Sequence, residues 1–559
     1  MKETIEFDAI VVGSGISGGW AAKELTEKGL KTLVLERGRD VRHIRDYPTA
    51  QMAPWEFKTR LFKDKSFRDE SPIQSGIFQY NEGNKHFFVN DKKHPYIQQD
   101  PFHWIRGYQV GGRSLIWGRQ CYRWSPIDFE ANAKDGASID WPIRYNDIEK
   151  WYSYVEKFVG ISGEKANIKQ LPDSEFLPPI PMNCVESHFS KEVAKNFDGR
   201  NVIPIRLANL TKKHNDRGPC MYQNRCDRGC VYGGYFSSNS ATIPAADSTG
   251  NLSLRPNSIV KEVLYDPKTK KAIGVKVIDQ ETKKELVFKA KIIFLNASTI
   301  ATAAILLNSK SEHFPDGLGN SSGQIGHNLM DHFSTTGTVA EYDGFKEFYY
   351  SGRNPGGIYI PRFHNLNNET DKTYKRGYAI HGKAQRQDWE DKKVDGFGKD
   401  FKNNLMKPGK WQIWLGAIGE TLPYFHNRIE LDENQKDEWG IPLLKIHFRY
   451  GENEITLRED SINESEKMLE KAGFKNIRSF RSELVPGSTI HEMGTARMGK
   501  DPKTSVLNAF NQMHDVKNVF ITDGSCMTSS ASQNPSLTYM ALTARACDFA
   551  VKQLKEGIL

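Results

Sequence analysis

Three glycines near the start of the chain have the spacing that brings a backbone turn against a phosphate. Gly13, Gly15 and Gly18 lie in VVGSGISGG, and Glu36 follows 21 residues after Gly15. In such a turn the first glycine allows the bend, the second lets the backbone approach a pyrophosphate, and the third lets helix and strand pack closely. The helix N-terminus offers N–H groups to the phosphates, and the carboxylate accepts from a ribose hydroxyl. The pattern predicts a dinucleotide site.

Three cysteines have spacing that could ligate one metal centre. Cys220, Cys226 and Cys230 follow the pattern C-x5-C-x3-C. A zinc site would need a fourth ligand, for which His214 is a candidate. Cysteine thiolates alone can hold an iron–sulfur cluster. The third interpretation is three unpaired cysteines in a loop, and the spacing by itself leaves all three open.

A second glycine-rich segment, residues 106–118, reads RGYQVGGRSLIWG. Gly111 and Gly112 precede a short helix start, where backbone can approach a ligand closely. On its own the segment is equally consistent with a simple turn.

Composition argues against several classes of function. The 559 residues include 77 basic and 69 acidic side chains, well interspersed, for a net charge of +8. Without a basic block we expect no nucleic-acid binding. No apolar run has the length of a transmembrane helix, and the apolar segment near the start is expected to be a strand rather than a signal peptide. The seven cysteines do not indicate a disulfide framework.

The first glycine turn must be held between a strand and a helix. Residues 9–12 and 32–35 are short apolar runs typical of buried parallel strands. Between them apolar residues recur at helical spacing, and Gly29 is the expected end of the helix. Further strands are predicted at 252–264, 272–279, 286–295 and 519–523, and further helices at 146–159, 299–308, 455–472 and from Pro535 to about 554.

Residues 335–450 show the alternation and the Gly- and Pro-containing turns of antiparallel sheet. The expected fold class is therefore α/β, with a Rossmann-like nucleotide-binding domain interleaved with an antiparallel-sheet substrate domain. We assign residues 1–130, 200–330 and 485–559 to the nucleotide-binding domain, with the cysteine loop near 218–232. Residues 131–199 and 331–484 are assigned to the substrate domain and connections.

With these elements placed, the chain resembles the glucose–methanol–choline (GMC) oxidoreductases, which are flavoproteins, over nearly its full length. The resemblance rests on the glycine turn with Glu36 and on VGGRSLIWG (110–118), IGHNLMDH (325–332), HEMGTARMG (491–499), DG (523–524) and QNP (533–535). The segment NASTIATA (296–303) departs from the usual family signature.

The resemblance implies that the nucleotide is FAD. The residues implied for its ADP half are Gly13, Gly15, Gly18, Glu36 and Val260, and those implied near the pyrophosphate and flavin are Gly111, Gly112, Trp117 and Asp523. Relatives with a covalent flavin carry a histidine where this chain has Ile116, so non-covalent FAD is expected.

His491 and Asn534 resemble the catalytic His–Asn pair of the family. A neutral imidazole suits removal of a hydroxyl proton, and the amide can orient the same oxygen. The helix that begins at Pro535 would direct its partial positive charge at the flavin. His327, His332 and His514 are expected to be structural, and Trp411, Trp414 and Tyr424 are either sugar-stacking or core residues.

The cysteine spacing also occurs in bacterial flavin sugar dehydrogenases that carry a three-iron cluster, and VYGGYFS after Cys230 resembles the glucoside 3-dehydrogenase branch. The resemblance thus implies FAD-dependent dehydrogenation of a sugar or glycoside, best placed at C3 of glucosides, with electrons passing through a [3Fe-4S] cluster to a cytochrome c-type acceptor. A signal-bearing small subunit would carry the chain to the periplasm; the alternative is the cytoplasm. The alternative activities are a sugar oxidase using O2, or a glucose C1 or polyol dehydrogenase.

Overall fold

The computed structural model describes residues 6–334, 336–348, 355–366, 372–387, 394–483 and 485–559. Residues 1–5, Thr335 at the start of the alternating pattern, and residue 484 at the end of the predicted substrate segment lie outside the described residues. None of the helices in the described ranges is long and apolar enough to cross a membrane.

Strand β1 (Glu6–Val12) lies inside a parallel sheet, between β2 (Thr32–Leu35) and β10 (Glu285–Leu295). Successive side chains of β1 point to opposite faces: Ala9 and Val11 pack in one hydrophobic cluster, and Ile10 and Val12 in another. Because both faces are covered, the end of the strand is apolar throughout, as the sequence indicated.

The described residues form a seven-stranded sheet in the order β7-β2-β1-β10-β9-β8, where β7 is Leu252–Arg255, β8 is Ser258–Asp266 and β9 is Lys271–Asp279. Strand β18 (Val519–Ile521) is also paired to β10. One edge of β10 has two partners. Residues 285–289 pair antiparallel with β9 (Lys271–Asp279), and residues 293–295 pair in parallel with β18. The parallel core therefore joins segments that lie far apart in the sequence.

The predicted strand at 252–264 is wrong as a single element. The structure has β7 (Leu252–Arg255) and β8 (Ser258–Asp266), which pair with β2 and β9 at opposite edges of the sheet. Pro256 has no N–H for a strand ladder, and Asn257 has φ of +52°, so the chain turns between them.

Helix α1 (Ile16–Glu27) ends where the sequence predicted. Gly29 has φ of +88°, and its N–H donates to the carbonyl of Thr26, as at a glycine-terminated helix end. The helix is buried on nearly all sides, because α10 (Ser536–Lys555) and α6 (Thr242–Asp247) pack against it. Helix α7 (Thr299–Asn308) packs against β8 and β15 (Arg428–Lys436).

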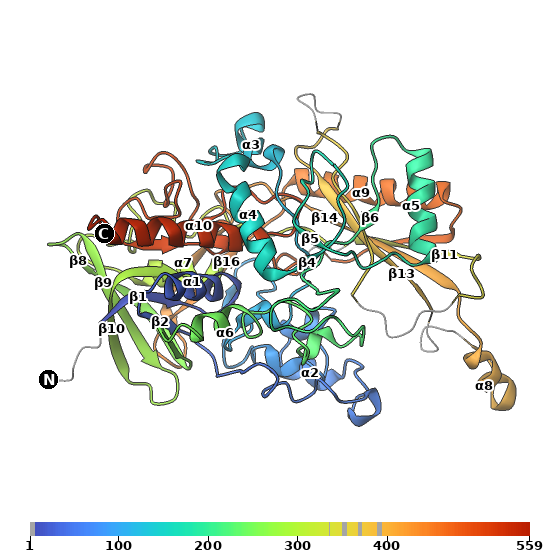
Figure 1. The fold of residues 1–559 in the computed structure, drawn as a ribbon, viewed down its shortest axis with the longest axis horizontal. Coiled ribbons are helices and arrows are strands. Elements are labelled where there is room, and N and C mark those ends of the chain that lie inside the picture. Colours follow the sequence, from blue (N-terminus) through green and yellow to red (C-terminus); the bar gives the residue numbers. More distant parts are fainter. Residues whose placement is uncertain (1–5, 335, 349–354, 367–371, 388–393, 484) are drawn as a thin grey trace.

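A second sheet, six-stranded in the described residues, has the order β17-β11-β14-β13-β12-β6. Its strands are β6 (Ile203–Pro204), β11 (Thr336–Tyr342), β12 (Ile358–Ile360), β13 (Tyr378–Arg386), β14 (Trp411–Gly419) and β17 (Lys475–Arg481). Helices α5 (Cys184–Asn196) and α9 (Glu452–Lys471) pack on it. This layer lies on the right of Figure 1, and the seven-stranded sheet with α1 and α10 lies on the left.

The alternating segment 335–450 does not form one sheet. Strands β15 (Arg428–Lys436) and β16 (Pro442–His447) are antiparallel to each other, but they form a separate sheet with β3 (Ile97–Gln98). Ile429 and Ile446 belong to the main core cluster, which also contains residues of β1 and α7. This hairpin therefore extends the nucleotide side of the molecule.

The remaining α-helices and strands lie outside these three sheets. They are α2 (Lys65–Glu70), α3 (Pro126–Asp135), α4 (Tyr145–Val159), α8 (Gly398–Met406), β4 (Ile161–Ser162) and β5 (Phe176–Leu177). The predicted fold class is confirmed: a Rossmann-like parallel sheet is interleaved with an antiparallel sheet. The predicted domain boundaries stay a prediction.

Candidate active site

The glycine turn between β1 and α1 is closed at two glycines and open at the third. A Cβ on Gly18 would lie 1.9 Å from the Gly13 carbonyl oxygen, and a Cβ on Gly13, whose φ is +92°, would lie 2.4 Å from the Asn296 carbonyl oxygen. A Cβ on Gly15 would meet nothing within 4 Å. The open space beside Gly15 belongs to a cavity, so the turn has room for a ligand where the sequence predicted a pyrophosphate.

Glu36, just after β2, is hydrogen bonded to the same turn. Its Oε2 accepts from the Ser14 N–H at 3.1 Å and from the Ser14 Oγ at 2.6 Å, and its Oε1 accepts from the Gly38 N–H at 3.0 Å. Burial raises the pKa of Glu36, and these donors oppose the rise. Ser14 Oγ also accepts from the Gly111 N–H at 2.9 Å. Ser14, which the sequence analysis passed over, joins the two glycine-rich segments.

Gly111 and Gly112 both have positive φ, of +89° and +50°, and open the 3-10 helix η4 (Gly112–Leu115). A Cβ on Gly111 would lie 1.7 Å from Asn239 Oδ1, and a Cβ on Gly112 would lie 3.3 Å from the Cα of Gly15. The glycine pair therefore packs directly beside the first glycine turn.

Trp117 and Val260 both line the cavity. Trp117 Nε1 donates to the Phe236 carbonyl at 2.9 Å. Val260 lies in β8, close to the end of β2 that carries Glu36.

Asp523 follows β18 and is buried in the cavity wall. Its Oδ2 accepts from the Ser298 N–H at 2.9 Å and from Thr302 Oγ1 at 2.6 Å. Ser298 caps α7 with φ of 86° and ψ of 159°. That conformation is nearly restricted to glycine and costs about 1–3 kcal/mol in other residues. The strained residue lies in the segment that departs from the family signature.

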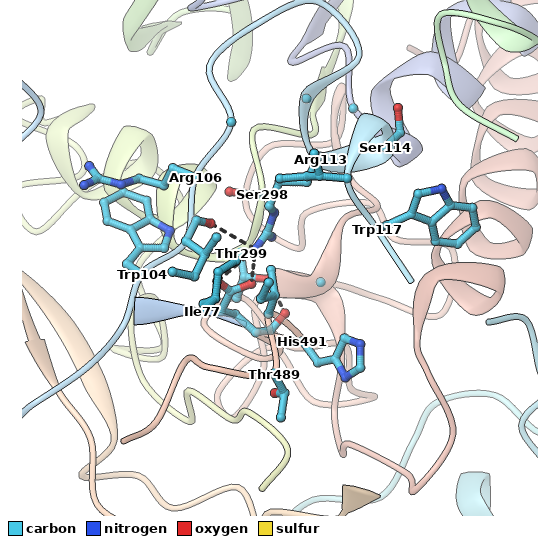
Figure 2. Close-up of a pocket in the computed structure, with 18 of the residues that line it drawn as sticks. Ile77, Trp104, Arg106, Arg113, Ser114, Trp117, Ser298, Thr299, Thr489 and His491 are labelled. Atoms are coloured by element: carbon cyan, nitrogen blue, oxygen red, sulfur yellow. Dashed lines mark hydrogen bonds and ion pairs between the residues drawn. The ribbon is translucent and has the colours of Figure 1, made fainter. Parts of the chain in front are cut away.

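The cavity has a volume of about 1450 Å³ and is lined from both sheets. The nucleotide side contributes Gly15, Glu36 and Val260, and the six-stranded sheet contributes His381 and Trp414. Figure 2 shows part of this wall, where the Arg113 side chain extends from η4 towards the segment that carries His491.

His491 lies in the wall of the cavity, and both its backbone and its ring are held. Its N–H donates to Asp331 Oδ1 at 3.0 Å, and its Nδ1 lies 2.9 Å from Nδ1 of His332. Its Nε2 lies 3.2 Å from Asn534 Nδ2. The structure thus brings His491 and Asn534 together, and it also brings in His332, which the sequence analysis treated as structural.

The pKa of His491 lies well below its usual value. Burial is the largest cause, because it disfavours the charged ring, and the neighbouring His332, Arg113 and His381 side chains disfavour that charge further. Arg113 is itself paired with Glu492, whose carboxylate oxygens lie 3.0 and 2.8 Å from its Nη1. A neutral imidazole can act as a base.

The N-terminus of α10 lies at the cavity. Asn534, Pro535 and Ser536 all contribute to the lining. Pro535 is the residue before the helix rather than its first residue, and its φ of −85° and ψ of −13° are already helical. The 20-residue helix directs its partial positive charge towards the cavity.

Comparison with known proteins assigns this arrangement to a family. GMC oxidoreductase family models match residues 7–334 and 423–543. The chain belongs to the GMC oxidoreductase family. The predicted resemblance is confirmed, and this GMC oxidoreductase is an FAD-binding enzyme acting on CH–OH donors.

Similar proteins match over almost the whole chain. The 2-methyl-1,2-propanediol dehydrogenase of Mycolicibacterium austroafricanum is 26% identical over 98% of this chain and 96% of its own. The fructose dehydrogenase large subunit of Gluconobacter japonicus is 25% identical over 100% of both. The solved structure of pyridoxine 4-oxidase from Mesorbium loti has a TM-score of 0.61 at 16% identity, covering 97% of this chain and 98% of that one. This last similarity concerns the fold alone.

The cysteine loop of this GMC oxidoreductase borders the same cavity. Cys226 contributes to the lining, and Cys230 Sγ accepts from the Gly234 N–H at 3.2 Å. Burial raises the pKa of Cys226, and raises that of Cys220 to about 11. Among the described residues, no group of three or more His, Cys, Asp or Glu is placed to hold a metal ion. The cluster therefore stays a prediction.

The proposed fourth zinc ligand is engaged elsewhere. His214 Nε2 lies 2.8 Å from the Lys157 carbonyl oxygen at the end of α4. The structure gives no support to the zinc interpretation with His214.

The three aromatic residues singled out in the sequence have different environments. Trp411 is 2% exposed and belongs to the core. Tyr424 donates its hydroxyl to Glu454 at 3.1 Å and lies outside the cavity lining. Trp414 lines the cavity, and its ring lies 5.1 Å from that of His381.

Proposed function

We propose that this chain is an FAD-dependent dehydrogenase that oxidises a sugar or glycoside hydroxyl to a ketone, best placed at C3 of a glucoside. The observation that carries the proposal is the neutral His491 beside Asn534, in the wall of a cavity that also contains the open side of Gly15. The similarity to sugar and alcohol dehydrogenases supports the substrate class.

Oxidation of an alcohol separates a proton from a hydride. In our proposal His491 Nε2 accepts the proton of the substrate hydroxyl, and Asn534 Nδ2 donates a hydrogen bond to the same oxygen. General-base catalysis of this kind contributes about 10²–10⁴-fold. FAD, when bound, supplies the acceptor of the hydride.

The residues around the cavity fit FAD, because the backbone is open at Gly15 and nowhere else in the glycine turn. Gly13, Gly15, Gly18, Glu36 and Val260 would hold the ADP half. Gly111, Gly112, Trp117, Asp523 and the N-terminus of α10 at Asn534 and Pro535 would lie against the pyrophosphate and flavin. Ile116 offers no atom for covalent attachment, in keeping with non-covalent FAD.

The wall opposite the nucleotide side has polar and aromatic groups suited to a sugar. His381 Nδ1 lies 3.2 Å from Gln120 Nε2, and both line the cavity beside Trp414. Trp414 is 36% exposed and offers a ring face for a pyranose. These side chains support a sugar or glycoside over a simple aliphatic alcohol.

Cys220, Cys226 and Cys230 would hold a [3Fe-4S] cluster, which supplies a one-electron carrier. The donor atoms are of the right kind, since three thiols share one short loop and Cys230 Sγ accepts a backbone N–H, but in the described residues the three thiols are not grouped closely enough to hold a metal ion. The acceptor would be a cytochrome c-type protein, and a signal-bearing small subunit would take the complex to the periplasm. The name "large subunit" of one relative supports a subunit partner.

Anaerobic spectroscopy tests the proposal. The purified chain should have a flavin spectrum that bleaches on adding glucose or a glucoside, and His491→Ala should retain FAD while reduction slows about 10²–10⁴-fold. His514→Ala is the matched control, because His514 contacts Ser505 outside the cavity. Reduction of His491→Ala at the wild-type rate would refute the assignment. Stoichiometric hydrogen peroxide from iron-free enzyme in air would favour the sugar oxidase instead.

A further inference from the structure

His332 lies between the two segments that carry the catalytic pair. Its ring Nε2 is 2.5 Å from the Ala531 carbonyl oxygen, three residues before Asn534. Its Nδ1 is 2.9 Å from Nδ1 of His491. The side chain is fully buried, so a single imidazole joins the two segments inside the protein.

The hydrogen-bond donors and acceptors that link Ala531, His332 and His491 can be arranged in only one way. The Ala531 carbonyl only accepts, so the proton of a neutral His332 is on Nε2 and its Nδ1 is an acceptor. Burial lowers the pKa of His332 to about 4, which keeps the ring neutral. His491 must then donate from Nδ1, and its own Nε2 carries the lone pair.

We propose that His332 is a positioning residue that fixes the tautomer of His491, so that the nitrogen facing Asn534 is the basic one. This inference rests on the proposed role of His491 as base. Without the acceptor at His332, the proton of His491 could reside on Nε2 instead, and a ring in that tautomer cannot accept the substrate proton there.

The backbone reinforces this arrangement. Asp331, the preceding residue, accepts from the His491 N–H at 3.0 Å and from the Gly487 N–H at 2.8 Å. The His332 carbonyl accepts from Tyr450 Oη at 2.9 Å and from Thr489 Oγ1 at 3.2 Å. Asp331 and His332 therefore hold the backbone and the ring of His491, so that neither this backbone nor this ring is free to turn.

The proton balance of the step is simple. The substrate O–H bond breaks, and its proton forms an N–H bond at His491 Nε2, which gives an imidazolium. The Nδ1–H of that imidazolium continues to donate to His332, so no second proton moves. The titratable side chains that act on the ring are His332, Arg113 and His381, and the Asp331 carboxyl accepts from the backbone N–H of His491.

A pair of amide substitutions tests the inference. His332→Asn can place its amide oxygen where Nδ1 lies and keep an acceptor for His491. His332→Gln places its amide nearer Nε2 and keeps only the Ala531 contact. Loss of the partner of a buried N–H corresponds to roughly a 5- to 150-fold effect. We expect this slowing of anaerobic flavin reduction in His332→Gln and His332→Leu, and no more than about threefold in His332→Asn.

The saturation constant for substrate separates positioning from general damage. It should stay within about twofold of wild type in every folded variant, as should FAD content, because Asn534 and the sugar-facing wall are unchanged. His514→Leu should reduce at the wild-type rate. Equal rates in the Asn and Gln variants, or a wild-type rate in His332→Gln, would overturn the inference. Wild-type reduction in His491→Ala would instead overturn the proposed function, so the two failures are distinguishable.

Discussion

Two glycines of the first turn allow folding and cofactor binding to be separated. Gly15 has φ of −66° and ψ of −160°, which valine can adopt, and its Cβ position is open. Valine is a poorer residue than glycine at a helix start, by up to about 1 kcal/mol. Because valine has less conformational freedom than glycine in the unfolded chain, the substitution also stabilises the folded state by about 0.4–1 kcal/mol, which offsets that loss. Gly15→Val should therefore fold, with FAD-free stability within about 1 kcal/mol of wild type.

The same substitution should abolish FAD retention. A valine side chain would occupy the space that the pyrophosphate needs, and hydrogen bonds from backbone N–H groups to a charged partner contribute about 1.5–3 kcal/mol each. Loss of two such bonds corresponds to about 3–6 kcal/mol, or roughly a 10²- to 10⁴-fold weaker affinity. Flavin absorbance of the purified protein and fluorescence titration of the FAD-free protein measure this.

Gly18→Val is the matched contrast. Its Cβ would lie 1.9 Å from a backbone oxygen that has no room to move between β1 and α1, so we expect no soluble folded protein. Gly15→Val that purifies with stoichiometric FAD and wild-type affinity would refute the placement of the pyrophosphate. Gly15→Val that fails to fold, beside a folded Gly18→Val, would refute the geometry of the turn.

Three further predictions follow from the site. Ser298→Gly should raise the free energy of unfolding of the FAD-free protein by about 1 kcal/mol in a denaturant titration, because glycine adopts φ of 86° without strain; a decrease would contradict this. Cys226→Ser should retain FAD and sugar-dependent flavin reduction but lose iron, labile sulfide and cytochrome-linked turnover; iron-free wild-type enzyme with full cytochrome turnover would remove the cluster. Because the pKa of His491 is lowered, its neutral form persists below pH 6.5, so flavin reduction should change little between pH 7.5 and 6; loss of half the rate near pH 6.5 would contradict the shift.

Local features of the sequence predicted the elements on either side of the first glycine turn. The strands on either side of the glycine turn are continuous apolar runs, and Gly29 ends α1 with a positive φ that only glycine adopts freely. These signals are contained in a few consecutive residues, so they can be read before the partners are known.

Local sequence features did not predict which strands pair with one another. Alternation marked β15 and β16 as antiparallel, but it did not show that Ile429 and Ile446 pack in the nucleotide-side core. Pro256 and Asn257 were a local signal for the break between β7 and β8, since proline interrupts a strand ladder. Which edge each strand then joins is decided by packing over long sequence distances.

The role of His332 also depends on contacts that no spacing reveals. It lies 159 residues from His491 and 199 from Ala531. His332 lies in the segment IGHNLMDH, on which the family resemblance partly rests, but that segment does not distinguish a functional histidine from a buried structural one. Ser14 has no local signal either, because its partners Glu36 and Gly111 lie 22 and 97 residues further along the chain.

The dual pairing of β10 has a consequence for biosynthesis. β18, which completes its parallel edge, lies about 226 residues further along the chain. At synthesis rates of about 5–20 residues per second, the ribosome makes β18 roughly 10–45 s after β10. During that interval the apolar end of β10 lacks a neighbour, and an unpaired strand edge is prone to aggregation. The yield of folded enzyme should therefore depend more on translation speed and chaperone supply than on the equilibrium stability of the finished protein.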